Sequence, residues 1–165
     1  MKANQNKLTF RPVTTEDIPQ ICVFPQTAEE LFFLFPKASY PLTVEQLEKS
    51  INSRFDPSVI CYENQTVAFA NIYDVVKDQY CFIGNVIVDP SKRGLGIGKY
   101  LLDHMINIAF HNHNIKEVRL VCFATNINAL LFYTKYGFKP YEIKPRETLD
   151  GKQTAAVYMK LDLVH

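Results

Sequence analysis

Residues 82–98 constrain the fold of this chain most, because an apolar strand runs there into a glycine-rich turn and a helix. The apolar run up to Val88 is stopped by Asp89 and Pro90. Two cations and three alternating glycines follow, and apolar residues then repeat at helical spacing over about residues 96–112. The segment therefore predicts a strand–turn–helix unit of an α/β fold.

The turn also has the features of a phosphate site. Glycine has no Cβ, so the backbone can come close to a ligand. The first N–H groups of a helix lack an internal partner, and the helix dipole adds partial positive charge at that end. Lys92, Arg93 and Lys99 add cationic charge. These features predict a site for a phosphate or pyrophosphate; the alternative is an ordinary junction in which the glycines serve close packing.

Three phosphate-binding patterns compete for this turn. A Walker loop requires Ser or Thr after its Gly-Lys pair, but Tyr100 stands there. The dinucleotide pattern G-x-G-x-x-G fits Gly94 and Gly96, but a lysine occupies the third glycine position. The pattern Arg/Gln-x-x-Gly-x-Gly/Ala fits Arg93, Gly96 and Gly98 without exception.

This third pattern resembles the acyl-coenzyme A pyrophosphate loop of the GNAT superfamily of N-acetyltransferases. Residues 126–138 read Asn-Ile-Asn-Ala-Leu-Leu-Phe-Tyr-Thr-Lys-Tyr-Gly-Phe. They are similar to the superfamily signature Asn-x-x-Ala-x-x-x-Tyr-x-x-x-Gly-Phe, at the expected distance after the glycine loop. With the strand order, the resemblance covers roughly residues 58–163, and the first 57 residues match only in general layout.

The resemblance implies an α/β GNAT-like fold: a mixed, mostly antiparallel sheet of about seven strands, with helices on both faces and a splay between the fourth and fifth strands. No repeat, low-complexity segment or linker interrupts the sequence, so we expect one α/β domain over residues 1–165, which the resemblance implies is an N-acetyltransferase domain. The strands are expected at 8–13, 58–62, 66–73, 80–88, 116–123, 138–144 and 154–163. Helices are expected from Thr14 or Thr15 onward and at 43–51, 96–112 and 126–135.

Residues 24–42 fit no regular pattern, because large apolar side chains crowd there between Pro25, Pro36 and Pro41. Proline interrupts regular structure, so we expect an irregular segment. In the superfamily this region is variable and shapes the acceptor pocket. Glu29 and Glu30 either lie on a solvated helix face or hold a cationic amine.

Composition excludes several classes of protein. The chain has 18 basic and 17 acidic residues, whereas a general nucleic-acid binder needs a strong basic excess. No apolar run approaches the roughly 18 residues of a membrane span, and no secretory signal begins the sequence. We therefore expect a cytoplasmic protein that binds neither nucleic acid nor membrane. No metal site is expected, because His111 and His113 point apart on a helix.

The resemblance also implies the residues of the site. The pantetheine arm of acetyl-CoA is expected between the strands at 82–88 and 116–123, with the pyrophosphate on the glycine loop. The implied cofactor-binding residues are Val86, Ile87, Val88, Arg93, Gly94, Leu95, Gly96, Ile97, Gly98, Lys99, Asn126, Ala129 and Phe132. Independently of the family, Asn126, Ala129 and Tyr133 share one helix face at i, i+3 and i+7.

The implied reaction is direct attack of an amine on the thioester of acetyl-CoA. Tyr133 is the implied catalytic residue, because its hydroxyl can donate a proton to the departing thiolate. Many relatives carry Glu or Asp three residues before the last Val of the glycine-loop strand, but this chain has Asn85, which cannot accept a proton. The amine proton then leaves through ordered water or through another carboxylate such as Asp74, and no base is assigned.

Two other classes of protein remain open. One is a non-catalytic acyl-CoA-binding module with a regulatory or interaction role, which the missing strand carboxylate favours. The other is a nucleotide-binding α/β domain, which the absence of Ser or Thr after Lys99 weakens. The acceptor is open among small amines, amino sugars, polyamines and peptide amines. Exposed sheet edges allow a homodimer.

Overall fold

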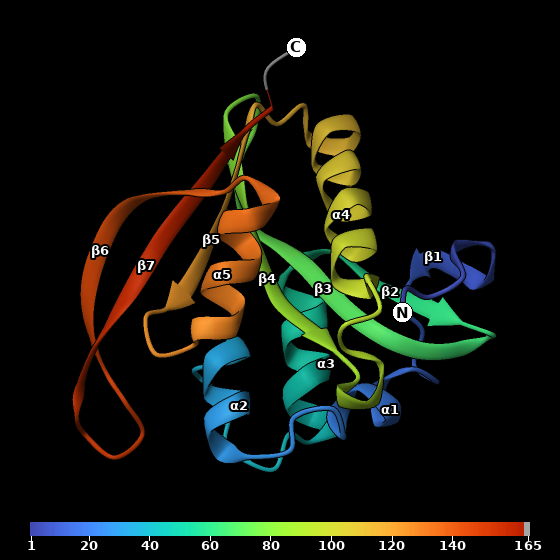
Figure 1. The fold of residues 1–165 in the computed structure, drawn as a ribbon, viewed down its shortest axis with the longest axis horizontal. Coiled ribbons are helices and arrows are strands. Elements are labelled where there is room, and N and C mark those ends of the chain that lie inside the picture. Colours follow the sequence, from blue (N-terminus) through green and yellow to red (C-terminus); the bar gives the residue numbers. More distant parts are fainter. Residues whose placement is uncertain (164–165) are drawn as a thin grey trace.

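The computed structural model describes residues 1–163, and a seven-stranded sheet of order β1-β2-β3-β4-β5-β7-β6 forms its centre (Figure 1). Neighbouring strands are antiparallel except β4 and β5, which are parallel. This arrangement confirms the expected sheet. The strands are β1 (Leu8–Pro12), β2 (Phe55–Tyr62), β3 (Gln65–Val76), β4 (Tyr80–Val88), β5 (Glu117–Phe123), β6 (Lys139–Glu147) and β7 (Gln153–Asp162).

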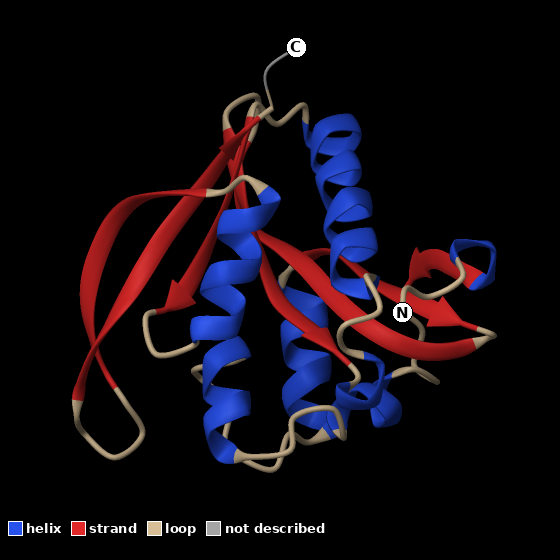
Figure 2. Ribbon diagram, viewed as in Figure 1, coloured by secondary structure: helices blue, strands red, loops and turns tan. Residues whose placement is uncertain are grey.

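Helices cover both faces of the sheet, as expected (Figure 2). They are α1 (Ile18–Cys22), α2 (Ala28–Leu34), α3 (Val44–Ser53), α4 (Ile97–His113) and α5 (Ile127–Tyr136), with 3-10 turns η1 (Gln5–Lys7) and η2 (Pro90–Lys92). Successive strand residues point to opposite faces, so Ile60 lies in the cluster under α4, whereas Val59 lies in the cluster with residues of α1 and α3. Two hydrophobic clusters, one on each face, result from this alternation. No helix in the described part of the chain is long and apolar enough to cross a membrane.

The sheet splays between β4 and β5. These strands pair only where Tyr80–Phe82 lies beside Glu117–Arg119. Beyond that point β4 continues beside β3, whereas β5 continues beside β7. Both strands therefore have residues without a partner on their facing sides, and a cleft opens between them.

Local signals place three helices correctly. Thr43 is the N-cap of α3 and accepts a hydrogen bond from the Gln46 N–H. Asn126 is the N-cap of α5 and accepts from the Ala129 N–H at 3.4 Å. Gly137 ends α5 at φ 125°, a conformation that glycine adopts without a Cβ clash. Helix α4 begins at Ile97, one residue from the expected start.

Two expectations in the N-terminal part were wrong. Neither Thr14 nor Thr15 caps α1, whose N-cap position is held by Asp17 without a side-chain cap bond. The segment 24–42 is not irregular throughout, because α2 forms within it and Thr27 caps that helix. Pro25 and Pro36 flank α2 and do not interrupt it.

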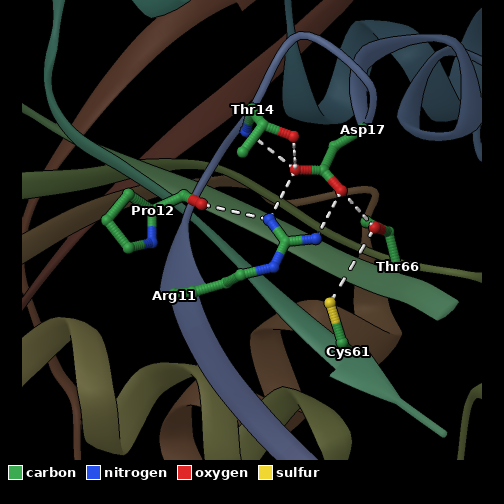
Figure 3. Close-up of polar contacts among 6 residues, drawn as sticks. All are labelled: Arg11, Pro12, Thr14, Asp17, Cys61 and Thr66. Atoms are coloured by element: carbon green, nitrogen blue, oxygen red, sulfur yellow. Dashed lines mark hydrogen bonds and ion pairs between the residues drawn. The ribbon is translucent and has the colours of Figure 1, made fainter. Parts of the chain in front are cut away.

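Asp17 is buried in a polar network that joins β1, α1 and β3 (Figure 3). Its carboxylate accepts two hydrogen bonds from the Arg11 guanidinium, at 2.7 and 2.8 Å, and one from Thr66 Oγ1 at 2.5 Å. The backbone N–H and the hydroxyl of Thr14 also donate to it. Burial alone would raise the pKa of Asp17, but these hydrogen bonds outweigh burial and hold that pKa well below its ordinary value. The Asp17 carboxylate therefore has a structural role.

Candidate active site

A cleft of ≈ 1780 Å³ opens where β4 and β5 diverge. One wall is formed by residues 83–88 of β4 and the other by residues 120–123 of β5. Helix α5 and the start of α4 close one side, and residues of α2 and α3 line the other. The cleft thus brings together segments that lie far apart in the sequence.

The cleft collects all but one of the site residues expected from the sequence. Tyr133, Val86 to Val88, Arg93, Gly94, Gly96 to Lys99, Asn126, Ala129 and Phe132 line it. Leu95 does not, because its side chain packs against the hydrophobic cluster beneath α4. The Leu95 carbonyl accepts a hydrogen bond from the Ala3 N–H at 2.8 Å, so Leu95 links the glycine loop to the N-terminal segment.

The glycine loop leaves open space in front of the first turn of α4. Gly96 is the N-cap of α4 with φ 86°, and a Cβ built on it would meet nothing within 4 Å. The first N–H groups of the helix therefore face this space without an internal partner. A Cβ on Gly98 would lie 3.3 Å from the Phe132 ring, so the small residue there lets α4 and α5 approach. Free helix N–H groups and nearby cations are the features of an anion-binding site, so this loop could hold an anionic group.

Two cations of the loop have acidic partners. Arg93 lies 3.3 Å from Glu30 on α2, and Lys99 lies 2.8 Å from Asp103 one turn further along α4. Glu30 is thus part of the cleft wall and is paired with a cation of the loop. Both pairs are substantially exposed, so they contribute little to stability and leave the cations accessible to an anionic ligand.

Tyr133 extends from α5 into the cleft and is 9% exposed. Its hydroxyl forms no hydrogen bond with any other residue in the range 1–163, so it is not tied to the backbone. Burial raises the pKa of Tyr133 well above its ordinary value, and the neighbouring Cys122 thiol acts in the same direction. The phenol therefore keeps its proton at neutral pH.

Cys122 on β5 also lines the cleft, where a thiol could act as a nucleophile. Burial raises the pKa of Cys122 to about 11. The reactive form of a cysteine is the thiolate, so this side chain is inert at neutral pH. The Cys122 thiol also donates to the backbone carbonyls of Phe123 and Asn126, as a buried structural cysteine would.

Asn85 is buried at a β-bulge in β4. Ile87 pairs with Phe69 and Gly84 with Asn71, so β4 carries one residue more than β3 over this stretch. The Asn85 amide makes four hydrogen bonds. Its Oδ1 accepts from Ser50, Asn71 and Arg54, and its Nδ2 donates to the Leu34 carbonyl at 2.7 Å. Asn85 thus joins α2, α3 and the sheet as a structural amide.

Several residues that line the cleft were not predicted from the sequence. Arg54 and Tyr73 lie on its α3 side, and Phe123 forms part of the β5 wall. Phe32 of α2 stacks on Phe123, with ring centroids 4.6 Å apart. No local pattern distinguishes these residues, since each enters the cleft only through the packing of distant elements. The aromatic composition of 24–42 was the one available signal.

The chain resembles known acetyltransferases over most of its length. It is 26% identical to the [ribosomal protein bS18]-alanine N-acetyltransferase of Escherichia coli over 151 residues, which cover 90% of this chain and 94% of that protein. Among solved structures, spermidine N-acetyltransferase from Vibrio cholerae in complex with CoA and spermine has a TM-score of 0.79 at 16% identity, with 95% of this chain and 96% of that chain covered. Ard1 from Thermoplasma volcanium has a TM-score of 0.78 at 22% identity, with coverage of 96% and 99%.

These structural likenesses establish the fold, and the family follows from the sequence. The model of the acetyltransferase (GNAT) family matches residues 24–138, which include the glycine loop, β4, β5 and α5. The match spans well over half of the chain and includes the cleft's two walls. The chain is therefore a member of the acetyltransferase (GNAT) family.

Proposed function

We propose that this protein transfers an acetyl group from acetyl-CoA to a primary amine, by direct attack within a ternary complex. The observation that carries the proposal is the single cleft that holds the glycine loop, the splayed strand β4 and the Tyr133 hydroxyl. Acetyl-CoA, when bound, supplies the activated acyl group. Family membership supports this choice of donor. We further propose that residues 1–165 act as one N-acetyltransferase domain in the cytoplasm, and the exposed strand β6 leaves room for a homodimer.

The proposed binding residues act through backbone and charge. The N–H groups at the start of α4, with Arg93 and Lys99, would hold the pyrophosphate. The edge of β4 at Val86 to Val88 would pair with the pantetheine amides, because β4 has no strand partner on this side. Asn126, Ala129 and Phe132 would line the opposite wall along α5.

The proposed proton steps need a donor at the leaving sulfur and an acceptor at the amine. Tyr133 Oη is the proposed donor, because it is protonated, unbonded and inside the cleft. Asn85 cannot serve as the acceptor, since an amide has no basic lone pair of use at neutral pH. Asp74 lines the cleft and is exposed, so either this carboxylate or ordered water would remove the amine proton.

The test of this function is thiol release from acetyl-CoA in the presence of a panel of amines. The panel contains amino acids, a peptide with a free α-amine, spermidine and an amino sugar. We expect release with at least one acceptor and formation of the N-acetyl product by mass spectrometry. Tight CoA binding without any release would support the non-catalytic acyl-CoA-binding module, and preference for ATP or NAD over CoA would contradict both.

We expect Gly96→Ala to weaken CoA binding about tenfold. A methyl group at this position enters the open space before α4, and a non-glycine residue is strained at φ 86°. Isothermal titration with CoA measures the effect. Gly151→Ala is the matched control, because Gly151 has φ 78° and the same open surroundings but lies outside the cleft. Equal CoA affinity in the two variants would remove the loop from the proposed binding site.

A further inference from the structure

Arg54 is a half-buried cation in the wall of the cleft, at the C-cap of α3. No carboxylate among residues 1–163 lies within ion-pair distance of it. Burial lowers the pKa of Arg54, and Tyr73 and Asp74 act in the opposite direction. A partly desolvated charge without a counter-ion is unfavourable unless a ligand completes the site.

The guanidinium of Arg54 is held firmly in place. Its Nη1 donates to Oδ1 of Asn71 at 3.0 Å and to Oδ1 of Asn85 at 3.1 Å. Its Cζ lies 4.2 Å from the centre of the Tyr73 ring, as in a cation–π contact. The absence of a side chain at Gly84 makes this position possible, since a Cβ there would lie 2.6 Å from both Arg54 Nη1 and the Tyr73 ring.

The other donors of Arg54 remain available. Its Nε and Nη2 form no hydrogen bond within the described range 1–163. These two nitrogens form the planar fork that matches the two oxygens of a carboxylate. Arg119 makes a useful contrast, because it also stacks on a tyrosine, at 3.6 Å from Tyr80, but has Glu117 as its carboxylate partner. Arg54 has the same setting without that partner.

The position of Arg54 relates it to the acyl group. Its partner Asn85 directly precedes Val86, where the proposed pantetheine site begins. An anion on Arg54 would therefore lie in the part of the cleft where the proposed pantetheine site begins. Other charged residues also line the cleft, are exposed and include both signs: Lys37, Lys49, Asp74, Arg146 and Glu147.

We propose that Arg54 binds the carboxylate of the acceptor, so that the acceptor is a small amino-acid-like zwitterion whose amine lies within a few atoms of that carboxylate. This proposal rests on the proposed acetyl transfer and names its acceptor class. The single positive charge of the Arg54 guanidinium neutralises one negative charge of a ligand. The negative charge of the nearby Asp74 would repel a dianion such as phosphate. A polyamine would place positive charge against Arg54, which is unfavourable by simple Coulomb repulsion.

The experiment compares each acceptor with its neutral analogue. Thiol release from acetyl-CoA is followed with glycine, phenylalanine, methionine, glutamate and lysine, each beside its C-terminal amide, and with spermidine. We expect kcat/KM for the best amino acid to exceed that for its amide at least tenfold. In Arg54→Gln this ratio should fall to near one, mainly through a higher KM for the carboxylate form. Arg54→Lys, which keeps the charge but not the fork, should recover part of the preference.

Two further variants separate binding from folding. Gly84→Ala displaces the guanidinium without removing it and should also lower the preference for the carboxylate. Arg119→Gln should leave the preference unchanged, because Arg119 lies outside the cleft. A structural defect would lower activity on both members of a pair equally. An amide or spermidine preferred by the native protein, or a carboxylate preference that survives in Arg54→Gln, would overturn the proposal. Absence of thiol release with every amine would instead contradict acetyl transfer itself.

Discussion

Tyr133→Phe is expected to lower kcat by about 10²-fold or more and to change CoA affinity less than twofold. Loss of a positioned proton donor typically costs this much in rate. The phenol forms no hydrogen bond with the described residues, so its removal leaves no partner unsatisfied. Phe occupies nearly the same volume, so the walls of the cleft remain in place. Steady-state thiol release and titration with CoA measure the two quantities separately.

Tyr136→Phe provides the matched control for this prediction. Tyr136 lies on the same helix, and its hydroxyl donates to Asp103 at 2.6 Å, outside the cleft. We expect its removal to leave kcat unchanged. If Tyr133→Phe and Tyr136→Phe retain equal turnover, Tyr133 has no part in the chemistry. The raised pKa of Tyr133 also predicts that its ionisation does not lower kcat between pH 7 and pH 9.

Asp17→Asn is expected to lower the free energy of unfolding by about 3 kcal/mol at pH 7. Asp17 is 4% exposed, and substitution would leave the Arg11 guanidinium without its anion. The value lies at the low end for a broken buried ion pair, because the Arg11 side chain is 40% exposed and retains some hydration. Urea denaturation measures the change. The exposed pair of Lys7 and Glu63 is the control, and Glu63→Gln should leave stability nearly unchanged.

The effect of Asp17 should depend on pH with a definite sign. Its folded-state pKa lies below the unfolded value of about 3.9, so the unfolded chain binds more protons in this range. The stabilisation is therefore complete above about pH 5 and is lost as pH falls toward the folded pKa. The stability difference between the native protein and Asp17→Asn should narrow at pH 3. A constant difference from pH 7 to pH 3 would mean that the pKa of Asp17 is not depressed by folding.

Much of the fold could be predicted from the sequence because its signals are local. Strand β4 has the predicted bounds, since an alternating apolar run ends there at Asp89 and Pro90. Helices α3 and α5 have the predicted N-caps, because Thr43 and Asn126 act within three residues of themselves. The expected cap of helix α1 was wrong because Thr14 donates its N–H and hydroxyl to the Asp17 carboxylate. That carboxylate also accepts hydrogen bonds from Arg11 and Thr66. No local pattern reports such contacts.

The candidate site also contains residues that local motifs predict and residues that only tertiary packing brings together. The glycine loop and Tyr133 belong to short motifs whose backbone geometry is set by neighbouring residues. Arg54 and Asn85 are separated by 31 positions and meet only because α3 packs against the bulged strand β4. Burial raises the pKa of Cys122, and the extent of that burial is set by the packing of distant elements. Short motifs therefore predicted cleft residues in the glycine loop and α5, whereas the residues around Arg54 are brought into the cleft only by tertiary packing.

The sequence by itself determined the strand–loop–helix unit, the helix caps and the family resemblance, because these depend on residues within a few positions of one another. Tertiary structure decided the rest: which helix faces meet, where the sheet splays, and which charges lose their water. The charge environment of Arg54 exists only when Tyr73, Asn71 and Asn85 surround it. Desolvation and ion pairing act through space, so the charge environment of this part of the cleft becomes visible only in the folded chain.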